Sequence, residues 1–299
     1  MASQQQVWLV TGCSTGFGRE IVPQILDRGD KVIATARNID SIKDLEGLGA
    51  GILQLDVTAS FEDIQQKIDE AITIYGRIDV LFANAGYVHY APIEEADASS
   101  DILRNMSTNT FGATNLLRAL MPQWRKQKSG FLLVNSSYMS WWSTHPGCGP
   151  YAASKAALDR LVTTFAKEAE LQQLNIKTLV VHPGHFRTDA TKLSKYNFDR
   201  PTTSYAEINA FSRGTLAAMH GQQPGDVKKA CKVLIDLIKG EGDVEGKEIS
   251  PTLPLGTDAW ETCVQETEKY LEMLKDWEGV IRSTDIVSGS SEWGAQVTE

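Results

Sequence analysis

The stretch VWLVTGCSTGFG, residues 7–18, decides the fold of this chain, because it carries an apolar run into a glycine-rich turn. The run Val7–Val10 is typical of a buried strand, and the residues after Gly18 follow a helical pattern. Glycines in such a turn let the backbone approach an anion, and the helix N-terminus supplies free N–H donors. A purely structural turn is the alternative, because the glycines are not spaced as G-x-G-x-x-G. We expect the turn to hold the pyrophosphate of a dinucleotide through Gly12, Ser14, Thr15, Gly16, Phe17 and Gly18.

Short apolar runs alternate with longer amphipathic segments along most of the chain. Strands are expected at 7–10, 31–35, 51–55, 78–82, 131–135, 177–181 and 247–249. Helices are expected at 18–28, 61–75, 100–126, 151–171 and 224–239. Most strand segments are rich in Val, Ile and Leu without clean alternation, as in strands buried on both faces. The alternation predicts an α/β fold, a doubly wound parallel sheet (Rossmann fold) with three layers α/β/α and about seven strands.

The chain divides into a main part and a shorter C-terminal part. We expect residues 1–250 to form a single dinucleotide-binding and catalytic domain, and residues 251–299 to form a C-terminal extension packed on it. The polar turn 240–243 precedes this extension, which contains one expected helix from about Asp258 to Trp277. The last dozen residues, from Ser288, are small and polar and read as a frayed tail.

Composition excludes several classes of partner. The net charge of −9 over 299 residues argues against nucleic acid and against anionic membrane surfaces. No apolar stretch approaches the ~20 residues that cross a bilayer, and the first strand leaves no room for a signal peptide. We therefore expect a cytoplasmic protein with reduced thiols. The four cysteines form no C-x-x-C pair and the five histidines no H-x-x-x-H pair, so we expect no metal.

Arg37 follows the second strand, at the place where dinucleotide folds choose between NAD and NADP. An acidic residue ~20 positions after the glycine turn binds the ribose 2′-OH of NAD, whereas an arginine suits the 2′-phosphate of NADP. The stretch 32–38 contains no carboxylate, and Ser14 adds a hydroxyl. We expect NADP (NADPH) as cofactor, with a solvated surface arginine as the alternative.

Two more strands end in polar residues that suit the adenosine half of such a cofactor. Asp56 and Val57 follow the third strand, and the Asn84-Ala85-Gly86 segment follows the fourth. Ligands of doubly wound sheets lie at the carboxyl ends of strands, so these residues are candidates for the adenine and its ribose. Each segment could equally be an ordinary turn, because Asp, Asn and Gly are typical turn residues.

Tyr151 and Lys155 lie four residues apart and share one face of an expected helix. A phenol has a pKa of ~10, and a neighbouring ammonium is expected to bring it toward the working range for acid–base chemistry. Ser137, at the end of the fifth strand, could hydrogen-bond a carbonyl oxygen, and Ser136 competes for this role. Asn109 lies inside an expected helix, where asparagine is unfavourable, and it could cap, pack or hold a water.

Together these motifs resemble the short-chain dehydrogenase/reductase family. The match runs from about Val7 to Ile249 and comprises TGxxxGxG at 11–18, NAG at 84–86, the serine at 137, YxxxK at 151–155 and Pro183-Gly184. The chain looks like an NADP-preferring member with a C-terminal extension, similar to microbial and fungal carbonyl reductases. The family often has a glycine shortly after the serine, which is missing here, so the shape of this loop stays open.

The resemblance implies a role for each matching residue. Tyr151 would be the proton donor or acceptor, Lys155 would hold the nicotinamide ribose and tune the tyrosine, and Ser137 would orient the substrate carbonyl. Asn109 would hold a water in a proton relay toward Lys155. The loop after the sixth strand would contact the nicotinamide half through Pro183, Gly184, Phe186 and Thr188.

These observations favour an NADP-dependent oxidoreductase that interconverts a ketone or aldehyde and an alcohol. An epimerase or dehydratase with bound cofactor is a second hypothesis, and a non-catalytic nucleotide-sensing regulator is a third. The candidate substrate residues are aromatic: Tyr87, His89, Tyr138, Trp141 and Trp142. They suggest a bulky, apolar small-molecule substrate. The two tryptophans could equally pack against 190–220 or in a subunit contact. The resemblance also implies a homodimer or a homotetramer and leaves the choice open.

Overall fold

The computed structural model describes residues 5–142, 145–195 and 204–286. Its centre is a seven-stranded sheet in which every pair of neighbouring strands is parallel, with the order β3-β2-β1-β4-β5-β6-β7. The strands are β1 (Val7–Val10), β2 (Lys31–Ala36), β3 (Gly51–Gln54), β4 (Val80–Ala83), β5 (Gly130–Asn135), β6 (Ile176–Pro183) and β7 (Thr252–Leu255). This is the doubly wound α/β sheet expected from the sequence.

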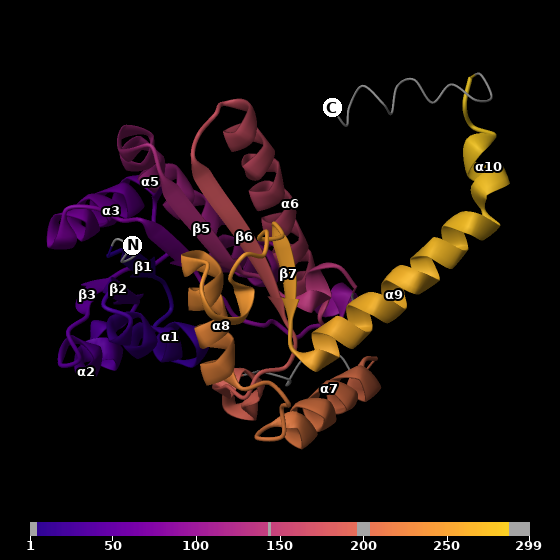
Figure 1. Cartoon of the computed structure of the whole chain (residues 1–299). Helices are drawn as coiled ribbons and strands as arrows, with labels where there is room; N and C mark the ends of the chain where they lie inside the picture. The colour runs from indigo at the N-terminus through magenta and orange to yellow at the C-terminus, as the bar shows by residue number, and fades with distance from the viewer. Residues whose placement is uncertain (1–4, 143–144, 196–203, 287–299) are drawn as a thin grey trace.

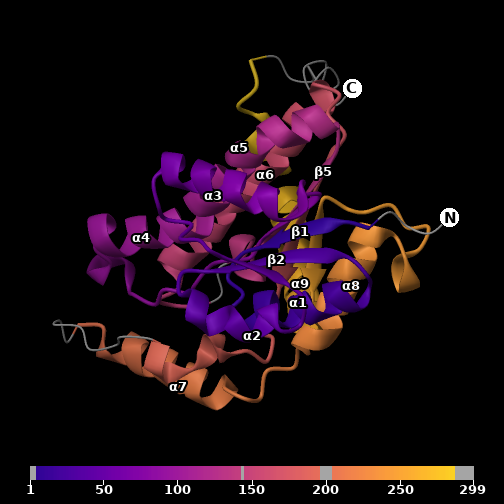
Figure 2. The ribbon, with the colours of Figure 1, turned by 90° about the vertical axis from the view of Figure 1, so that its left-hand side faces the viewer.

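Helices cover both faces of the sheet, as parallel strands joined by crossovers require. One face carries α1 (Gly16–Asp27), α2 (Lys43–Glu46) and α8 (Val227–Lys239), and the other carries α3 (Phe61–Tyr75), α5 (Gly112–Gln127) and α6 (Gly149–Leu171) (Figure 2). The remaining helices lie beyond these layers: α4 (Leu103–Met106), α7 (Ala206–Met219), α9 (Thr257–Asp276) and α10 (Glu278–Arg282). No helix among the described residues is both long and apolar enough to span a membrane.

The core has two halves, one on each face of the sheet, because successive residues of a strand point to opposite sides. In β1, Trp8 and Val10 belong to the half under α1 and α8, whereas Val7 and Leu9 belong to the half under α3, α5 and α6. Both halves contain a fully buried tryptophan, Trp8 in one and Trp124 in the other. A strand buried on both faces explains the continuous apolar runs of the sequence.

A buried ion pair ties α8 to the start of the sheet. Lys239 Nζ lies 2.9 Å from Asp30 Oδ2, and their side chains are 5% and 1% exposed. Asp30 also accepts hydrogen bonds from the Gln6 backbone N–H and the Trp8 indole. Each ionic group therefore has partners that offset the cost of its burial.

Three details differ from the sequence-based expectations. The last strand is β7 at Thr252–Leu255 rather than 247–249. Lys247 and Glu248 are exposed and do not suit a strand of the sheet. The apolar 252–255 run forms an edge strand, where Pro254 is tolerated. The expected helix 100–126 is interrupted by two π-helical turns, η3 (Ala98–Ile102) and η4 (Ser107–Phe111). Helix α7 was not expected, since its sequence has only a weak apolar stripe.

The C-terminal extension contains a strand and two helices rather than one helix. Trp277 leaves the helical conformation, with φ −99° and ψ 2°, and so separates α9 from α10. The start of α9 packs on the domain through Ala259 and Cys263, which are buried. Beyond it, every residue of 267–286 is exposed, and Figure 1 shows α9 leading away from the sheet. The expected frayed tail lies outside the described residues.

Buried thiols predict how stability depends on pH. Burial raises the pKa of Cys13 and of Cys148 to about 12, and it raises the pKa of Cys231 well above the ordinary value of a thiol. Between these values the unfolded chain loses thiol protons that the native state keeps. Stability should therefore be fully present below pH 9 and fall above it, by about 1.4 kcal/mol per pH unit for each thiol.

Urea unfolding between pH 8 and pH 11 measures this slope directly. Cys231→Ala should lower the free energy of unfolding at pH 8 and flatten the alkaline slope by the share of one thiol, so that the two curves converge toward pH 11. An identical slope in the variant would show that Cys231 ionises equally easily in both states.

Candidate active site

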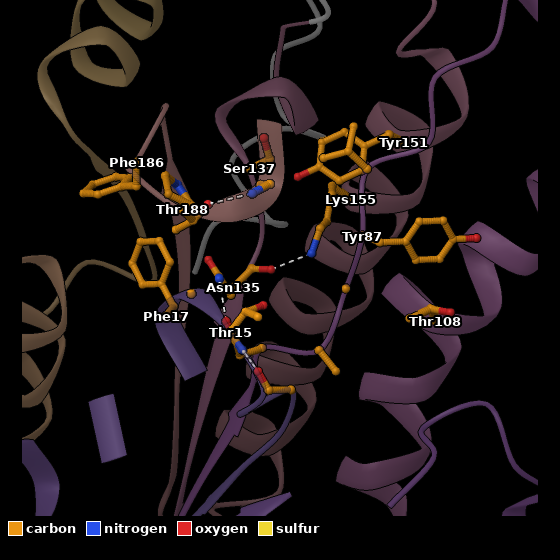
Figure 3. Close-up of a pocket in the computed structure, with 18 of the residues that line it drawn as sticks. Thr15, Phe17, Tyr87, Thr108, Asn135, Ser137, Tyr151, Lys155, Phe186 and Thr188 are labelled. Carbon is orange, nitrogen blue, oxygen red and sulfur yellow. Dashed lines mark hydrogen bonds between the residues drawn. The ribbon is translucent and has the colours of Figure 1, made fainter. Parts of the chain in front are cut away.

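A cleft of about 400 Å³ opens at the carboxyl ends of the strands. It lies where the strand order reverses between β1 and β4, which is the general ligand position of doubly wound sheets. Most residues singled out in the sequence line it: Gly12, Ser14, Thr15, Gly16, Phe17, Arg37, Asp56, Val57, Asn84, Ala85, Gly86, Tyr87, Ser137, Tyr138, Tyr151, Lys155, Pro183, Gly184, Phe186 and Thr188. Figure 3 shows several of them facing one another across the cleft.

The glycine turn has a backbone geometry that glycine adopts more readily than other residues. Gly12 and Gly16 adopt φ values of +72° and +62°, in the left-handed region that favours glycine. Gly18 does not line the cleft but supports it from behind, since a Cβ there would lie 2.5 Å from the Gly12 carbonyl oxygen. The turn therefore closes tightly onto the first helix and leaves the N-terminus of α1 open to the cleft.

Hydrogen bonds from Thr11 join this turn to the end of β4. The backbone N–H groups of Asn84 and Ala85 donate to Thr11 Oγ1, both at 3.0 Å. Asn84 Nδ2 donates to the Thr11 carbonyl oxygen at 2.8 Å, and Asn84 Oδ1 accepts from Asn135 Nδ2 at 2.8 Å. The ends of β1 and β4 are thus joined by bonds between side chains and backbone, and the ends of β4 and β5 by a bond between two side chains.

Lys155 extends this connection to helix α6. Its Nζ donates to the Asn135 carbonyl oxygen at 2.6 Å, and the side chain is 4% exposed (Figure 3). Burial lowers the pKa of Lys155 to about 8, and the nearby charge of Asp159 opposes this shift. Lys155 is therefore still mainly cationic at neutral pH, although it has little solvent around it.

Tyr151 and Ser137 lie together at the cleft. Burial raises the pKa of Tyr151 to about 12, while a side-chain hydrogen bond from Ser137 lowers it. We expected the ammonium of Lys155 to lower this pKa, but desolvation dominates, so the phenol is neutral over the physiological range. A neutral phenol can donate a proton to an oxygen placed between it and Ser137.

The structure distinguishes the two candidate serines. Ser137 faces Tyr151, and its Oγ accepts a hydrogen bond from the Met139 backbone N–H at 3.2 Å. Ser136 also lines the cleft, but no hydrogen bond joins it to Tyr151 among the described residues. Its Oγ is buried and has no partner among the described residues.

Asn109 lies in the π-helical turn η4, which accounts for an asparagine within a helical segment. Such turns are rare and often mark functional sites. Its Nδ2 donates to the Tyr87 carbonyl oxygen at 3.0 Å and to Ser154 Oγ at 2.9 Å, while its Oδ1 accepts from the Tyr87 N–H at 3.0 Å. Asn109 therefore holds the backbone after Gly86 and stands behind the cleft lining.

Arg37 lies at the end of β2 with its side chain exposed at the cleft. Gln54 Nε2 donates to its carbonyl oxygen at 2.9 Å, which fixes the backbone of this corner. Within the described parts of the chain the Arg37 guanidinium forms no ion pair, and the residue before it is Ala36. A free cation without a neighbouring acid is suited to a phosphate group.

The aromatic residues divide into two groups. Tyr87 and Tyr138 line the cleft, together with Tyr90, which the sequence analysis did not select. Three expected substrate residues do not line it. His89 faces Asp101, Trp141 stacks on His182 with ring centroids 4.2 Å apart, and Trp142 lies 6.1 Å from Tyr270 of α9. The tryptophans instead pack the loop after β5 against β6 and against the extension.

The C-terminal extension anchors the loop after β6. The Gly184 N–H donates to the Leu255 carbonyl oxygen at 2.9 Å, and the His185 N–H donates to Asp258 Oδ2 at 2.7 Å. Burial raises the pKa of Asp258, but the hydrogen bonds and charge of His185 outweigh it, so the pKa is lowered. A Cβ on Gly184 would lie 2.2 Å from Asp258 Oδ1, so only glycine fits there.

Sequence reasoning missed the supporting residues of the site: Asn135, Asp159, His182 and Asp258. Asp159 carried a usable signal, since it follows Lys155 by four residues on the same helix face. Asn135 was seen only as the end of a strand, and Asp258 lies far from the cleft in sequence. Among the described residues no cluster of three or more His, Cys, Asp or Glu could hold a metal ion.

Comparison with known proteins supports this geometry. The family model for short chain dehydrogenases matches residues 6–197. The chain is 31% identical to the oxidoreductase BOA17 of Botryotinia fuckeliana over 91% of this chain and 96% of the relative. It is 33% identical to a 3-ketodihydrosphingosine reductase of Bacteroides thetaiotaomicron over 63% and 66%. A short-chain dehydrogenase from Streptomyces avermitilis has 33% identity and a TM-score of 0.82, over 95% of this chain and all of that one.

The glycine turn gives a test of the cleft as a dinucleotide site. A methyl group in Gly18→Ala would meet the Gly12 carbonyl and Asn84 Nδ2 at 2.5 and 2.6 Å, and so force the turn open. Dinucleotide binding, followed by fluorescence titration, should weaken on the order of tenfold or more, which is about 1.4 kcal/mol. Gly214→Ala is the matched control, because a Cβ there meets nothing within 4 Å. Equal affinities in the two variants would contradict the assignment of this turn.

Proposed function

The chain belongs to the short-chain dehydrogenase family, and from this premise we propose that it is an NADP-dependent oxidoreductase that interconverts a ketone or aldehyde and an alcohol. The observation that carries the proposal is the pairing of Tyr151 with Ser137 at one end of a cleft whose other end is a glycine turn. One end provides proton chemistry and the other accommodates a pyrophosphate.

Tyr151 is the proposed proton donor for reduction. Its buried phenol is neutral, so it carries the proton that a developing alkoxide requires. Ser137 donates a second hydrogen bond to the same oxygen and orients it. The cofactor, when bound, supplies the hydride.

Lys155 and Asn109 are proposed to support this pair. The Lys155 ammonium is fixed by the Asn135 carbonyl and stabilises negative charge on the phenol during proton transfer. It also holds the nicotinamide ribose. Asn109 keeps the Gly86–Tyr87 backbone in place beside Lys155, and a water at its carboxamide would continue the proton path.

The residues present fit a dinucleotide with a 2′-phosphate. The tight glycine turn and the open N-terminus of α1 suit the pyrophosphate, and the exposed Arg37 suits the 2′-phosphate in charge and geometry. Asp56 and the Asn84–Gly86 backbone would hold the adenosine. The loop anchored by Asp258 would hold the nicotinamide half through its backbone and Thr188.

The proposed substrate is a bulky, apolar carbonyl compound. The side of the cleft next to Tyr151 is lined by aromatic and aliphatic side chains, including Tyr87, Tyr90, Tyr138 and Met139. Such a lining favours apolar groups around one polar centre. The relative from Bacteroides thetaiotaomicron is, by its name, a reductase of a ketone.

We also place the enzyme in the cytoplasm, as a homodimer or homotetramer. The four cysteines are free and buried, which suits a reducing compartment. Exposed apolar residues in α9 and directly after it, such as Leu271 and Trp277, suit a protein with subunit contacts.

Cofactor choice gives the first test of the proposal. Arg37→Ala combined with Ala36→Asp removes the phosphate partner and supplies an acceptor for the 2′-OH of NADH. Hydrogen bonds to charged groups contribute about 1.5–3 kcal/mol, so the ratio of kcat/KM for NADPH to that for NADH should fall at least tenfold. Arg125→Ala is a control for loss of charge, since Arg125 is exposed in the last turn of α5. An unchanged ratio would remove Arg37 from the site.

The proton donor gives the second test. Tyr151→Phe deletes one oxygen and keeps the ring, and general acid catalysis contributes ~10²–10⁴-fold. In a panel of apolar ketones and aldehydes followed at 340 nm, kcat should fall by at least that factor while NADPH binding changes little. Tyr75→Phe, which removes a phenol oxygen from α3 outside the cleft, is the matched control and should retain turnover. Wild-type rates in Tyr151→Phe would mean that the proposed mechanism is wrong.

A further inference from the structure

Behind the proposed catalytic residues lies a second cluster of buried polar groups that the mechanism above does not use. Asp159 on α6 and His182 on β6 have side chains that are 1% and 0% exposed. His182 Nε2 lies 2.8 Å from Asp159 Oδ2, and the Ser140 hydroxyl contacts the same carboxylate oxygen. The Trp141 ring covers His182.

The cluster joins the three segments that carry the site. Asp159 lies one helical turn after Lys155 and two turns after Tyr151, on the same face of α6. Ser140 belongs to η5 (Tyr138–Ser140), which directly follows Ser137. His182 directly precedes Pro183 and the loop proposed to hold the nicotinamide half. The carboxylate of Asp159 therefore links α6, which carries it, to η5 through Ser140 and to β6 through His182.

The carboxylate also acts through its charge. In a poorly solvated site a charge is felt more strongly than in water. Asp159 opposes the effect of burial on Lys155 and so favours its charged form. The other titratable groups that face the phenol of Tyr151 are Cys148 and Tyr138, which are both buried. The negative charge of Asp159 thus partly compensates the cost of burying the Lys155 ammonium.

We propose that Asp159 is a positioning residue of the active site, whose carboxylate, held by His182 and Ser140, keeps the buried Lys155 protonated and directed at Asn135 and the cofactor ribose. The inference rests on the proposed function, because it assigns Lys155 to the ribose. Because the inference concerns only the nicotinamide ribose, it applies to NADPH and NADH alike.

Two roles for Asp159 can be separated by substitution. If its charge matters, the isosteric Asp159→Asn should disturb Lys155, whereas Asp159→Glu, which keeps the charge, should not. If only its shape matters, Asn is the milder change and Glu the more disruptive one.

The experiment is a pH titration of nucleotide binding between pH 6 and pH 10, followed by nucleotide fluorescence without substrate. Wild-type affinity should weaken as the pH passes about 8, where Lys155 loses its proton. Asp159→Asn should move this midpoint down by about one pH unit, since a nearby opposite charge shifts a pKa by ~1–3 units. Asp159→Glu should keep the wild-type midpoint. Glu168→Gln, which removes an exposed carboxylate from the same helix, is the matched control and should also keep it.

If Asp159→Asn does not fold, the double variant Ser140→Ala with His182→Gln keeps the carboxylate and removes both partners. Because the inference requires a carboxylate held by these two groups, the midpoint should fall below that of the wild type, and an unmoved midpoint would overturn the inference. So would an unmoved midpoint in Asp159→Asn, or an equal fall in Asp159→Asn and Asp159→Glu. If the wild type binds neither NADPH nor NADH, the proposed function fails and this inference with it. Binding with an unmoved midpoint overturns this inference alone.

Discussion

One chain of hydrogen bonds, from Lys155 through Asn135 and Asn84 to Thr11, determines how the rest of the site is arranged. A parallel sheet aligns its strands but does not by itself position side chains beyond their ends. Here β1 and β4 pair in the sheet, and beyond their ends the two amides and the threonine continue the connection at the point where the strand order reverses. Because these groups are largely removed from water, an unmade bond would cost about 1–3 kcal/mol, which holds the arrangement to one geometry. The glycine turn on one side and α6 on the other are thus placed relative to each other.

The site combines burial with charge in a way that a solvent-exposed pair would not. Burial alone favours a neutral tyrosine and a neutral lysine, and the structure retains the first effect while opposing the second through Asp159. The consequence is a phenol that keeps its proton at neutral pH, beside a cation that would favour the phenolate if the proton were transferred. Neither property follows from the four-residue spacing, because spacing fixes which side chains meet and not how much water surrounds them.

Periodicity and motif context predicted the sheet, six of its strands, and most residues of the cleft, because these depend on local patterns. The glycine turn is one example, where the left-handed backbone at Gly12 and Gly16 could be anticipated from residue type. Features that depend on distant contacts were not predictable. The last strand was placed five residues too early, since the short 252–255 run is ambiguous until it pairs with β6. The positions of Trp141 and Trp142 depend on His182 and on α9, and the role of Asp258 depends on a contact 73 residues away.

The anchoring of the loop after β6 by the C-terminal extension has a consequence for how the molecule is made. Ribosomes release the chain from its N-terminus, and domains fold as their residues emerge. The partners of Gly184 and His185, Leu255 and Asp258, emerge about 70 residues after the loop itself. A nascent chain can therefore assemble the glycine turn and the first six strands while the loop after β6 still lacks its partners. This end of the cleft reaches its final geometry only after Leu255 and Asp258 have been synthesised.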